Sequence, residues 1–481
     1  MGTCDTLAPP AAPRTESHSS REEFVAPMPP PVITFTDERL SNGLRVIISE
    51  DHLAPVVAVN LWYDVGSKHE EPGKTGFAHL FEHVMFQGSA HVSKAEHMSI
   101  VQAAGGTMNG STWLDRTNYY ETMPAHQLDL ALWLEADRMA TLLDALSQEN
   151  LDNQRDVVKN EKRSSYDNRP YGTWVEKLFG HVFPPEHPYH HPTIGSMADL
   201  DAASVEDVSA FFRRYYAPNN AVLTIAGDVD PTAASAAVER YFGAIPPNPD
   251  IPPLGDLSLP LQIGREIRET VPDRVPLPRI YWGFRAPPYG DRRVEALDVA
   301  GQILSGGKGS RLHRRLVRET RLAQDVVFTT LGFLHGSVAI GWATARPGTT
   351  LPELEAVFWE ELERITEEPV TDDELERARA LIESDELGAL QRVEERADRL
   401  SMHATLFDDP GGINDVLARY LAVTAGDIRS AAREVLRADN RVVLTYVPAG
   451  PPADEAAEPV EAPAAQPEDE EPGAGDEEIA A

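Results

Sequence analysis

The sequence has little cysteine, few basic residues and no long apolar run, and each shortage excludes a class of protein. Its 481 residues contain one cysteine, Cys4, which excludes an intramolecular disulfide and a cysteine-based metal site. Lysine and arginine number 43 against 77 acidic residues, and the net charge of −34 disfavours nucleic-acid binding. No segment approaches the ~20 apolar residues of a membrane span, and no apolar stretch follows a basic start. We therefore expect a cytoplasmic protein that binds neither nucleic acid nor membranes.

Both ends of the chain differ in composition from the rest. Residues 449–481 carry eleven acidic groups and no basic ones, among Ala, Pro and Gly. Such a segment cannot bury enough apolar surface to offset its chain entropy. A run of three prolines at 29–31 gives the start a similar low-complexity character. We expect a disordered leader over 1–32 and an acidic disordered tail over 449–481.

The remaining length suits two domains of roughly 200 residues each. In the first half, residues 43–49 and 55–63 are rich in β-branched and aromatic residues and predict strands. Residues 75–87 predict a helix, with Thr75 as its N-cap and Gly88 as its stop. Further helices are predicted over 93–104, 126–145, 148–165 and 204–216, followed by a strand over 221–226.

The second half repeats this order after a proline-rich segment. Residues 279–284 resemble residues 57–63 of the predicted strand, and residues 296–306 resemble residues 78–88 around the predicted helix. The helix 375–386 and the strand 441–446 match 151–162 and 221–226. The sequence therefore predicts an α+β fold of two homologous domains, each a mainly antiparallel sheet covered by helices. We expect these domains over 33–247 and 262–448, joined by a linker at 248–261.

The segment GFAHLFEHVMFQG carries the chemistry. On a helix, His79, Glu82 and His83 share one face, beside a stripe of apolar residues. Burying two imidazoles and a carboxylate is costly unless they have partners. A zinc ion supplies that partner, because His79 and His83 lie one turn apart and can bind one ion. Glu82 can then act as general base, and the order His-x-x-Glu-His is an inverted zinc-peptidase motif.

A catalytic zinc needs a third protein ligand and one open position. Glu161 is a candidate because it lies on the apolar side of the predicted helix 148–165, beyond Val157 and Val158. Its alternative is a surface position among lysine and arginine neighbours. Periodicity does not decide between them, and Glu121, Glu135 and Glu149 also compete for the role.

The motifs together resemble the pitrilysin, insulysin and mitochondrial processing peptidase family over about 33–448. HLFEH with FQGS behind it resembles the family's zinc helix, and RDVVKNEKRSSYDNRPYG resembles its second signature. The resemblance implies that Glu161 is the third zinc ligand. It also implies that GGTMNGSTWLDRTNYY is the strand that pairs with substrate, where Asn109 matches the family's substrate-contacting asparagine.

The sequence departs from the family pattern at two positions. Gln154 stands where the family often has a second acidic residue, which affects the support of the metal site. Arg311 matches a substrate-binding arginine of the family's C-terminal half, but Gln324 replaces the tyrosine that accompanies it. The second half also lacks the metal motif, since Leu297, Ala300 and Gly301 stand where the first half has its two histidines and glutamate.

These features predict an endopeptidase with one zinc per chain, which hydrolyses short or unfolded peptides through a metal-activated water. The alternative is a catalytic or non-catalytic subunit of a heteromeric processing-peptidase-like complex that is inactive alone. The resemblance implies a chamber built from two chains, so we expect a homodimer or a heterodimer with a related chain.

Overall fold

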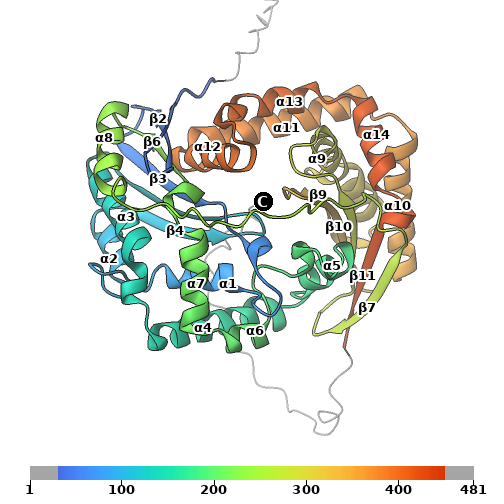
Figure 1. Ribbon diagram of the computed structural model, residues 1–481. Helices are drawn as coiled ribbons and strands as arrows, with labels where there is room; N and C mark the ends of the chain where they lie inside the picture. Colours follow the sequence, from blue (N-terminus) through green and yellow to red (C-terminus); the bar gives the residue numbers. More distant parts are fainter. Residues whose placement is uncertain (1–30, 450–481) are drawn as a thin grey trace, which may run out of the picture. The chain divides into compact units, whose positions relative to one another are not determined.

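The computed structural model describes residues 31–449, which form two β-sheets, one in each half of the chain (Figure 1). Almost all of the predicted leader and tail lie outside the described residues. The first sheet has the order β1-β2-β6-β3-β5-β4 and is antiparallel except for the parallel pair β2–β6. Its strands are β1 (Thr36–Arg39), β2 (Arg45–Glu50), β3 (Val56–Tyr63), β4 (Thr107–Thr112), β5 (Thr117–Pro124) and β6 (Ala221–Gly227).

The second sheet has the order β7-β11-β8-β10-β9, and only its pair β7–β11 is parallel. Without β1, the first sheet has the same order and the same parallel pair, so the two halves repeat one topology. The α+β prediction of two homologous, mainly antiparallel domains is therefore confirmed. The strands are β7 (Ile267–Asp273), β8 (Arg279–Ala286), β9 (Ala323–Leu331), β10 (Ser337–Ala345) and β11 (Arg441–Pro448).

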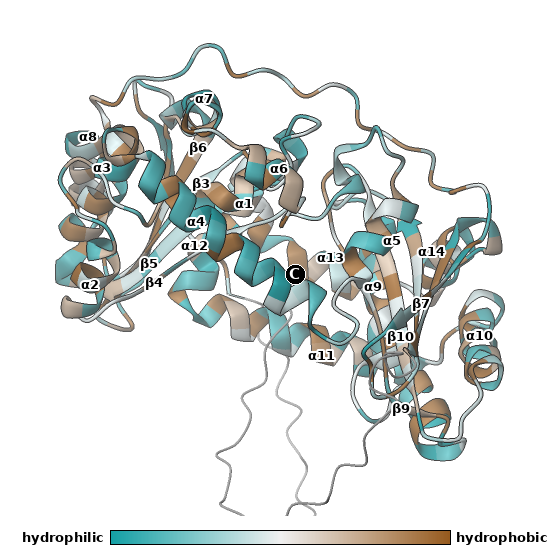
Figure 2. Cartoon of the chain, turned by 90° about the horizontal axis from the view of Figure 1, so that it is seen from below, coloured by the Kyte–Doolittle hydropathy of each residue, from teal (hydrophilic) through white to brown (hydrophobic). Residues whose placement is uncertain are grey.

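Apart from α5 (Trp174–Val182), the helices of the first half share one apolar core with the first sheet, because their buried side chains form a single cluster with β2, β3, β5 and β6. The predicted linker 248–261 contains no helix or strand and runs between the two halves (Figure 2). The helices are α1 (Phe77–Val84), α2 (Glu96–Ala103), α3 (Leu128–Ala145), α4 (Gln148–Glu161), α5 (Trp174–Val182), α6 (Met197–Ala202), α7 (Val205–Tyr215) and α8 (Pro231–Phe242).

The second half forms its own core around β8, β9 and β10. Within this core the rings of Trp282 and Phe358 stack on each other, with their centroids 3.8 Å apart. None of the described helices is long and apolar enough to cross a membrane. The helices are α9 (Arg292–Ser305), α10 (Leu351–Glu367), α11 (Asp372–Gln391), α12 (Val393–Phe407), α13 (Val416–Ala422) and α14 (Ala425–Val435).

The two halves exchange a helix. Helix α5 of the first half packs on β8 and β11 of the second sheet, and α12 of the second half packs on β3 and β6 of the first (Figure 1). The two exchanged helices occupy equivalent positions in the repeat, since α5 follows α4 in the first half and α12 follows the equivalent helix α11 in the second. Because each sheet needs both faces covered, neither half buries its sheet without the other.

Candidate metal centre

Helix α1 points one face into the core and the other toward the site. Phe77, Leu80, Phe81 and Val84 are buried, and they hold the helix against the first sheet. His79, Glu82 and His83 are only half-buried on the adjoining face. Helix α1 is therefore enclosed on its apolar face, and its polar face stays accessible to a ligand.

The start of α1 differs from the prediction. Thr75 is not the N-cap, because its hydroxyl donates to the Asp199 carboxylate at 2.6 Å and the helix begins after Gly76, whose φ is 90°. The cap is Glu70, which accepts hydrogen bonds from the backbone N–H groups of Gly76 at 2.9 Å and Ala78 at 2.8 Å. Sequence reasoning missed Glu70, because a residue six positions before the N-cap lies outside the local capping pattern.

The carboxylate of Glu161 lies beside both histidines. Its carboxylate oxygens lie 3.7 Å from His79 Nε2 and 3.2 Å from His83 Nε2, and the two Nε2 atoms lie 3.4 Å apart. The last residue of α4 supplies this carboxylate, just before a π-helical turn at Lys162–Asp167. The structure therefore brings together the three residues that the sequence and the resemblance nominated as ligands.

These separations fit a tetrahedral zinc ion. Ligand atoms at ~2.0–2.1 Å from a tetrahedral zinc lie about 3.3–3.4 Å from one another. The Nε2–Nε2 separation of 3.4 Å and the His83–Glu161 Oε2 separation of 3.2 Å are close to this value, and the 3.7 Å contact of His79 is made to the other oxygen, Oε1. Burial lowers the pKa of His79 to about 4, with His83 adding to the effect, so its imidazole is in the neutral form that binds metal. The pKa of Glu161 is lowered by its contact with His83, which keeps the carboxylate ionised.

The outer support of this site is incomplete. The Nδ1 atom of His79 is buried and has no hydrogen-bond partner among the described residues. Gln154, the residue that departs from the family's acidic pattern, donates instead to its neighbour Asn153 at 3.3 Å. Metal-binding histidines ordinarily donate their second nitrogen to an acceptor, so this part of the site differs from the usual arrangement.

The competing glutamates lie elsewhere. Glu121 and Glu135 form a second buried group with His97, but the Arg138 guanidinium donates to both oxygens of Glu135 and places a fixed positive charge there. That charge opposes binding of a metal cation, so we interpret this group as a buried ion-pair network. Glu149 is exposed on α4, far from its last residue.

Glu82 lies one residue before His83 on α1. Burial raises its pKa, and the nearby Thr112, His83 and Arg116 oppose the rise. A carboxylate whose pKa is shifted toward neutrality is a stronger general base than an exposed one. Thr112 and Arg116 belong to β4 and to the turn after it, so the base faces the end of this strand.

Strand β4 is the edge of the first sheet and lies next to α1. A Cβ atom at Gly110 would lie 3.3 Å from Phe86, which shows how closely strand and helix-end approach. Asn109 is exposed on this edge, and its side-chain oxygen accepts from the backbone of Gly110 at 2.9 Å. Its predicted contact with substrate remains a prediction.

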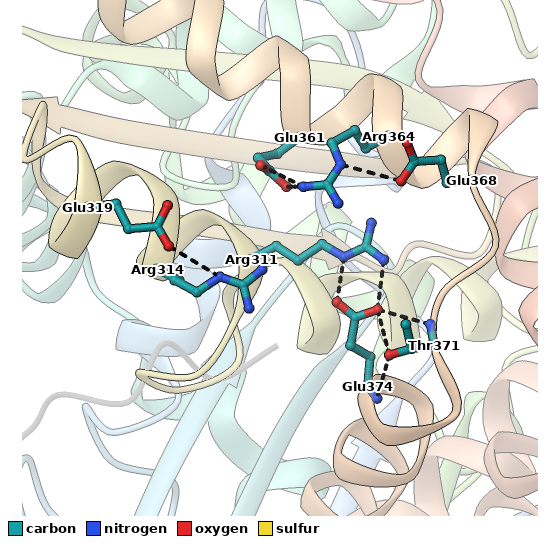
Figure 3. Close-up of polar contacts among 8 residues, drawn as sticks. All are labelled: Arg311, Arg314, Glu319, Glu361, Arg364, Glu368, Thr371 and Glu374. Carbon is teal, nitrogen blue, oxygen red and sulfur yellow. Dashed lines mark hydrogen bonds and ion pairs between the residues drawn. The ribbon is translucent and has the colours of Figure 1, made fainter.

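Arg311 does not lie with these residues. It is buried in the second half, and its guanidinium makes two hydrogen bonds of 2.7 Å to Glu374, which also caps α11 together with Thr371 (Figure 3). Gln324 is exposed on β9. The predicted substrate contact of Arg311 would require this ion pair to open.

The second half carries no metal donors at the equivalent positions. Leu297, Ala300 and Gly301 lie buried on α9 where α1 has His79, Glu82 and His83. The fold and the site thus define a protein of two homologous halves, with one inverted zinc-peptidase motif in the first and a repeat without that motif in the second.

Comparison with known proteins identifies the family. The model of the insulinase family, peptidase family M16, matches residues 45–181, and the model of the peptidase M16 inactive domain matches 202–382. The chain is 28% identical to the zinc protease PqqE of Helicobacter pylori over 83% of its length and 89% of that protein's. It is 27% identical to an uncharacterised zinc protease of Streptomyces coelicolor, covering 82% and 86% of the two chains. The chain belongs to peptidase family M16.

Solved structures agree with this assignment. A protease from Helicobacter pylori superposes with a TM-score of 0.82 at 27% identity and covers 87% of this chain and 100% of its own. The peptidase M16 inactive domain from Pseudomonas fluorescens has a TM-score of 0.74 at 17% identity, with coverage of 87% and 100%. At that identity the likeness shows the fold alone.

Proposed function

We propose that this chain is a zinc-dependent endopeptidase that hydrolyses short or unfolded peptides. The observation that carries the proposal is the triangle of His79, His83 and Glu161, whose donor atoms lie 3.2–3.7 Å apart beside Glu82. The naming of two relatives as zinc proteases supports the same metal and the same reaction class.

Each residue of the site has a defined part. His79, His83 and Glu161 hold one zinc, which when bound lowers the pKa of a water and polarises a peptide carbonyl. Glu82 takes the proton of the attacking water and passes it to the leaving amine. Its raised pKa and its place beside the ligands suit both transfers.

The edge of β4 offers a place for the peptide. An extended peptide can add to an open sheet edge through backbone hydrogen bonds, and Asn109 lies exposed on this edge beside α1. Strand addition requires an extended substrate, so a folded protein would be a poor one. This requirement is the basis for proposing short or unfolded peptides.

The second candidate is a subunit of a heteromeric processing-peptidase-like complex, catalytic or non-catalytic, that is inactive alone. Two observations favour it: Arg311 is held by Glu374, and Gln324 replaces the family's tyrosine. A related chain could supply the missing substrate contacts. Either function implies a homodimer or a heterodimer, and the cytoplasmic location remains a prediction.

The decisive experiment compares purified chain with and without a chelator on a library of short peptides. Zinc-dependent cleavage by the wild type and its loss in Glu82→Gln, with zinc retained, would support the first function. General-base loss costs about 10²–10⁴-fold in rate. Cleavage by Glu82→Gln at the wild-type rate would refute the assigned base, whereas activity that appears only with a related chain would favour the second function.

A further inference from the structure

A cavity of about 540 Å³ lies between the two halves of the chain, within the size range of small-ligand sites. Trp62, Trp113 and Arg116 of the first half line it from one side. Helices α9, α11 and α12 and strand β9 of the second half line the rest, including Met402 and Leu406. Neither half forms this cavity alone.

Most carboxylates in its wall already have partners. Asp398 accepts hydrogen bonds from Asn60, Trp62 and Asn118, at 2.7–3.1 Å. Asp298 accepts from the Tyr420 hydroxyl at 2.8 Å.

Two more carboxylates are occupied in the same way. Glu386 is paired with Arg399, and Asp115 accepts from the Tyr189 hydroxyl and the Leu334 backbone. Among the lining carboxylates of the described residues, Asp385 alone has no hydrogen bond or ion pair, and it is exposed. Asp298 and Asp398 are each bonded through one oxygen by neutral donors and keep their negative charge, so the cavity has a mainly apolar wall with acidic groups in it.

Most of the wall is apolar, and one edge of the Arg116 guanidinium faces it with donors that are free among the described residues. Aromatic side chains such as Trp62, Trp113 and Tyr289 contribute to the wall with Met402 and Leu406. Large apolar side chains gain most from such a site, because they bury 150–250 Å² or comparable apolar area on entering it.

Only the Nη1 atom of the Arg116 guanidinium donates hydrogen bonds to the described residues. Its Nη1 atom donates to the Ser111 carbonyl at 2.9 Å and to Asn118 Oδ1 at 3.1 Å, and its guanidinium carbon lies 5.3 Å from the Trp62 ring centroid. The Nε and Nη2 atoms have no acceptor within hydrogen-bond distance among residues 31–449. These donors can therefore serve a carbonyl oxygen of a bound peptide.

The cavity begins where the edge strand ends. Arg116 and Trp113 form the turn that joins β4 to β5, with the Trp113 N–H bonded to the Arg116 carbonyl at 2.9 Å. A peptide that pairs along β4 therefore reaches this turn within one strand length. The segment of peptide beyond β4 is the occupant that this geometry favours.

We propose that the cavity is a substrate subsite that takes large apolar side chains of the peptide, while Arg116 binds a backbone carbonyl at its entrance. This inference rests on the proposed peptidase function and adds a preference that the metal centre alone does not give. It makes the inactive half a specificity element, because that half supplies most of the apolar wall.

Binding can be measured without turnover in the zinc-loaded Glu82→Gln protein. Fluorescence anisotropy would follow three labelled peptides that are alike except for one position, occupied by Phe, Ala or Lys. The position is scanned along the peptide to find the one that faces the cavity. We expect the Phe peptide to bind about tenfold more tightly than the Ala peptide at that position, as burial of one large side chain implies.

Two test variants in the Glu82→Gln background, each with a matched control, locate the effect. Leu406→Trp fills the cavity and should abolish the preference for Phe, whereas Leu381→Trp on the outside of α11, where Leu381 is 36% exposed, should not. Arg116→Gln should weaken all three peptides about tenfold, as loss of a charged hydrogen bond implies, and the exposed control Arg274→Gln should leave them unchanged. Met402→Phe provides a milder filling if Leu406→Trp fails to fold.

Opposite outcomes would overturn the inference. Tighter binding of the Lys peptide would show a cationic subsite, and an equal Phe preference in the filled and control variants would place the apolar subsite elsewhere. Because these are binding measurements, they are independent of cleavage. A wild-type chain that cleaves no peptide would refute the proposed function while the binding series still tests the subsite.

Discussion

Replacing Glu70 with glutamine should make the stability of the metal-free protein less dependent on pH. The Glu70 side chain is fully buried and caps α1, the helix that carries His79 and His83. Burial raises its pKa from 4.5 to about 8, with Asp199 adding to the rise, although the backbone N–H groups of Gly76 and Ala78 oppose it. The native state therefore holds a proton on Glu70 at pH values where the unfolded chain has lost it.

The sign and size of the effect follow from this shift. Between about pH 4.5 and pH 8 the folded chain binds more protons than the unfolded chain, so the free energy of unfolding falls as pH rises. A change in pKa from 4.5 to about 8 corresponds to roughly 3–4 kcal/mol lost between pH 5 and pH 8. Glutamine keeps one of the two acceptor oxygens and carries no titratable proton, so the Glu70→Gln variant should be less stable but should lack this slope.

Urea unfolding in the presence of a chelator, at pH 5, 6.5 and 8, measures the effect. The chelator removes metal binding, whose own pH dependence would otherwise enter the comparison. Glu71→Gln is a matched control, because Glu71 is the next residue and is exposed. The titrations of all other groups are common to the three proteins. Equal pH slopes in wild type and Glu70→Gln would show that Glu70 is ionised when buried and would refute the reasoning.

Three further outcomes are expected. Glu161→Ala should lose zinc by metal analysis and Glu149→Ala should retain it, because only Glu161 lies with the histidines; the reverse result would reject the third ligand. One protein offered as substrate in native and denatured forms should be cut only when denatured, since strand addition needs an extended chain; equal rates would contradict binding along β4. The mass in solution should be that of a dimer, and a fully active monomer would remove the need for a second chain.

The sequence predicted the central elements of the fold because their apolar patterns are local. Strands β2, β3 and β6 and helices α1, α3, α4 and α7 lie where alternation or helical spacing placed them. The boundaries of α1 were less well predicted, since Thr75 has the right chemistry for a cap but Asp199, distant in sequence, takes its hydroxyl. A local pattern cannot reveal such a competing partner.

Only part of the candidate site could be predicted, because the rest depends on contacts between residues that are distant in sequence. Spacing on one helix indicated His79, Glu82 and His83 directly, but Glu161 could not be separated from Glu121 or Glu135 by periodicity. The structure separates them through Arg138, which pairs with Glu135 beside Glu121 and has no such contact with Glu161. The family resemblance had reached the same choice from a motif, without this physical reason.

The exchange of α5 and α12 was not predicted, because amphipathic spacing shows that a helix is covered without showing which sheet covers it. The exchange gives the inactive half a physical reason to be retained. Helix α12 covers the face of the first sheet opposite α1, and its Asp398 holds three side chains of that sheet, including Asn118 of β5 and Trp62 of β3. Loss of the second half would leave those donors and that apolar face exposed, beside the strand edge where the peptide is proposed to bind. The second half, which lacks the metal-binding residue types, thus stabilises the sheet on which the candidate metal site of the first half is built.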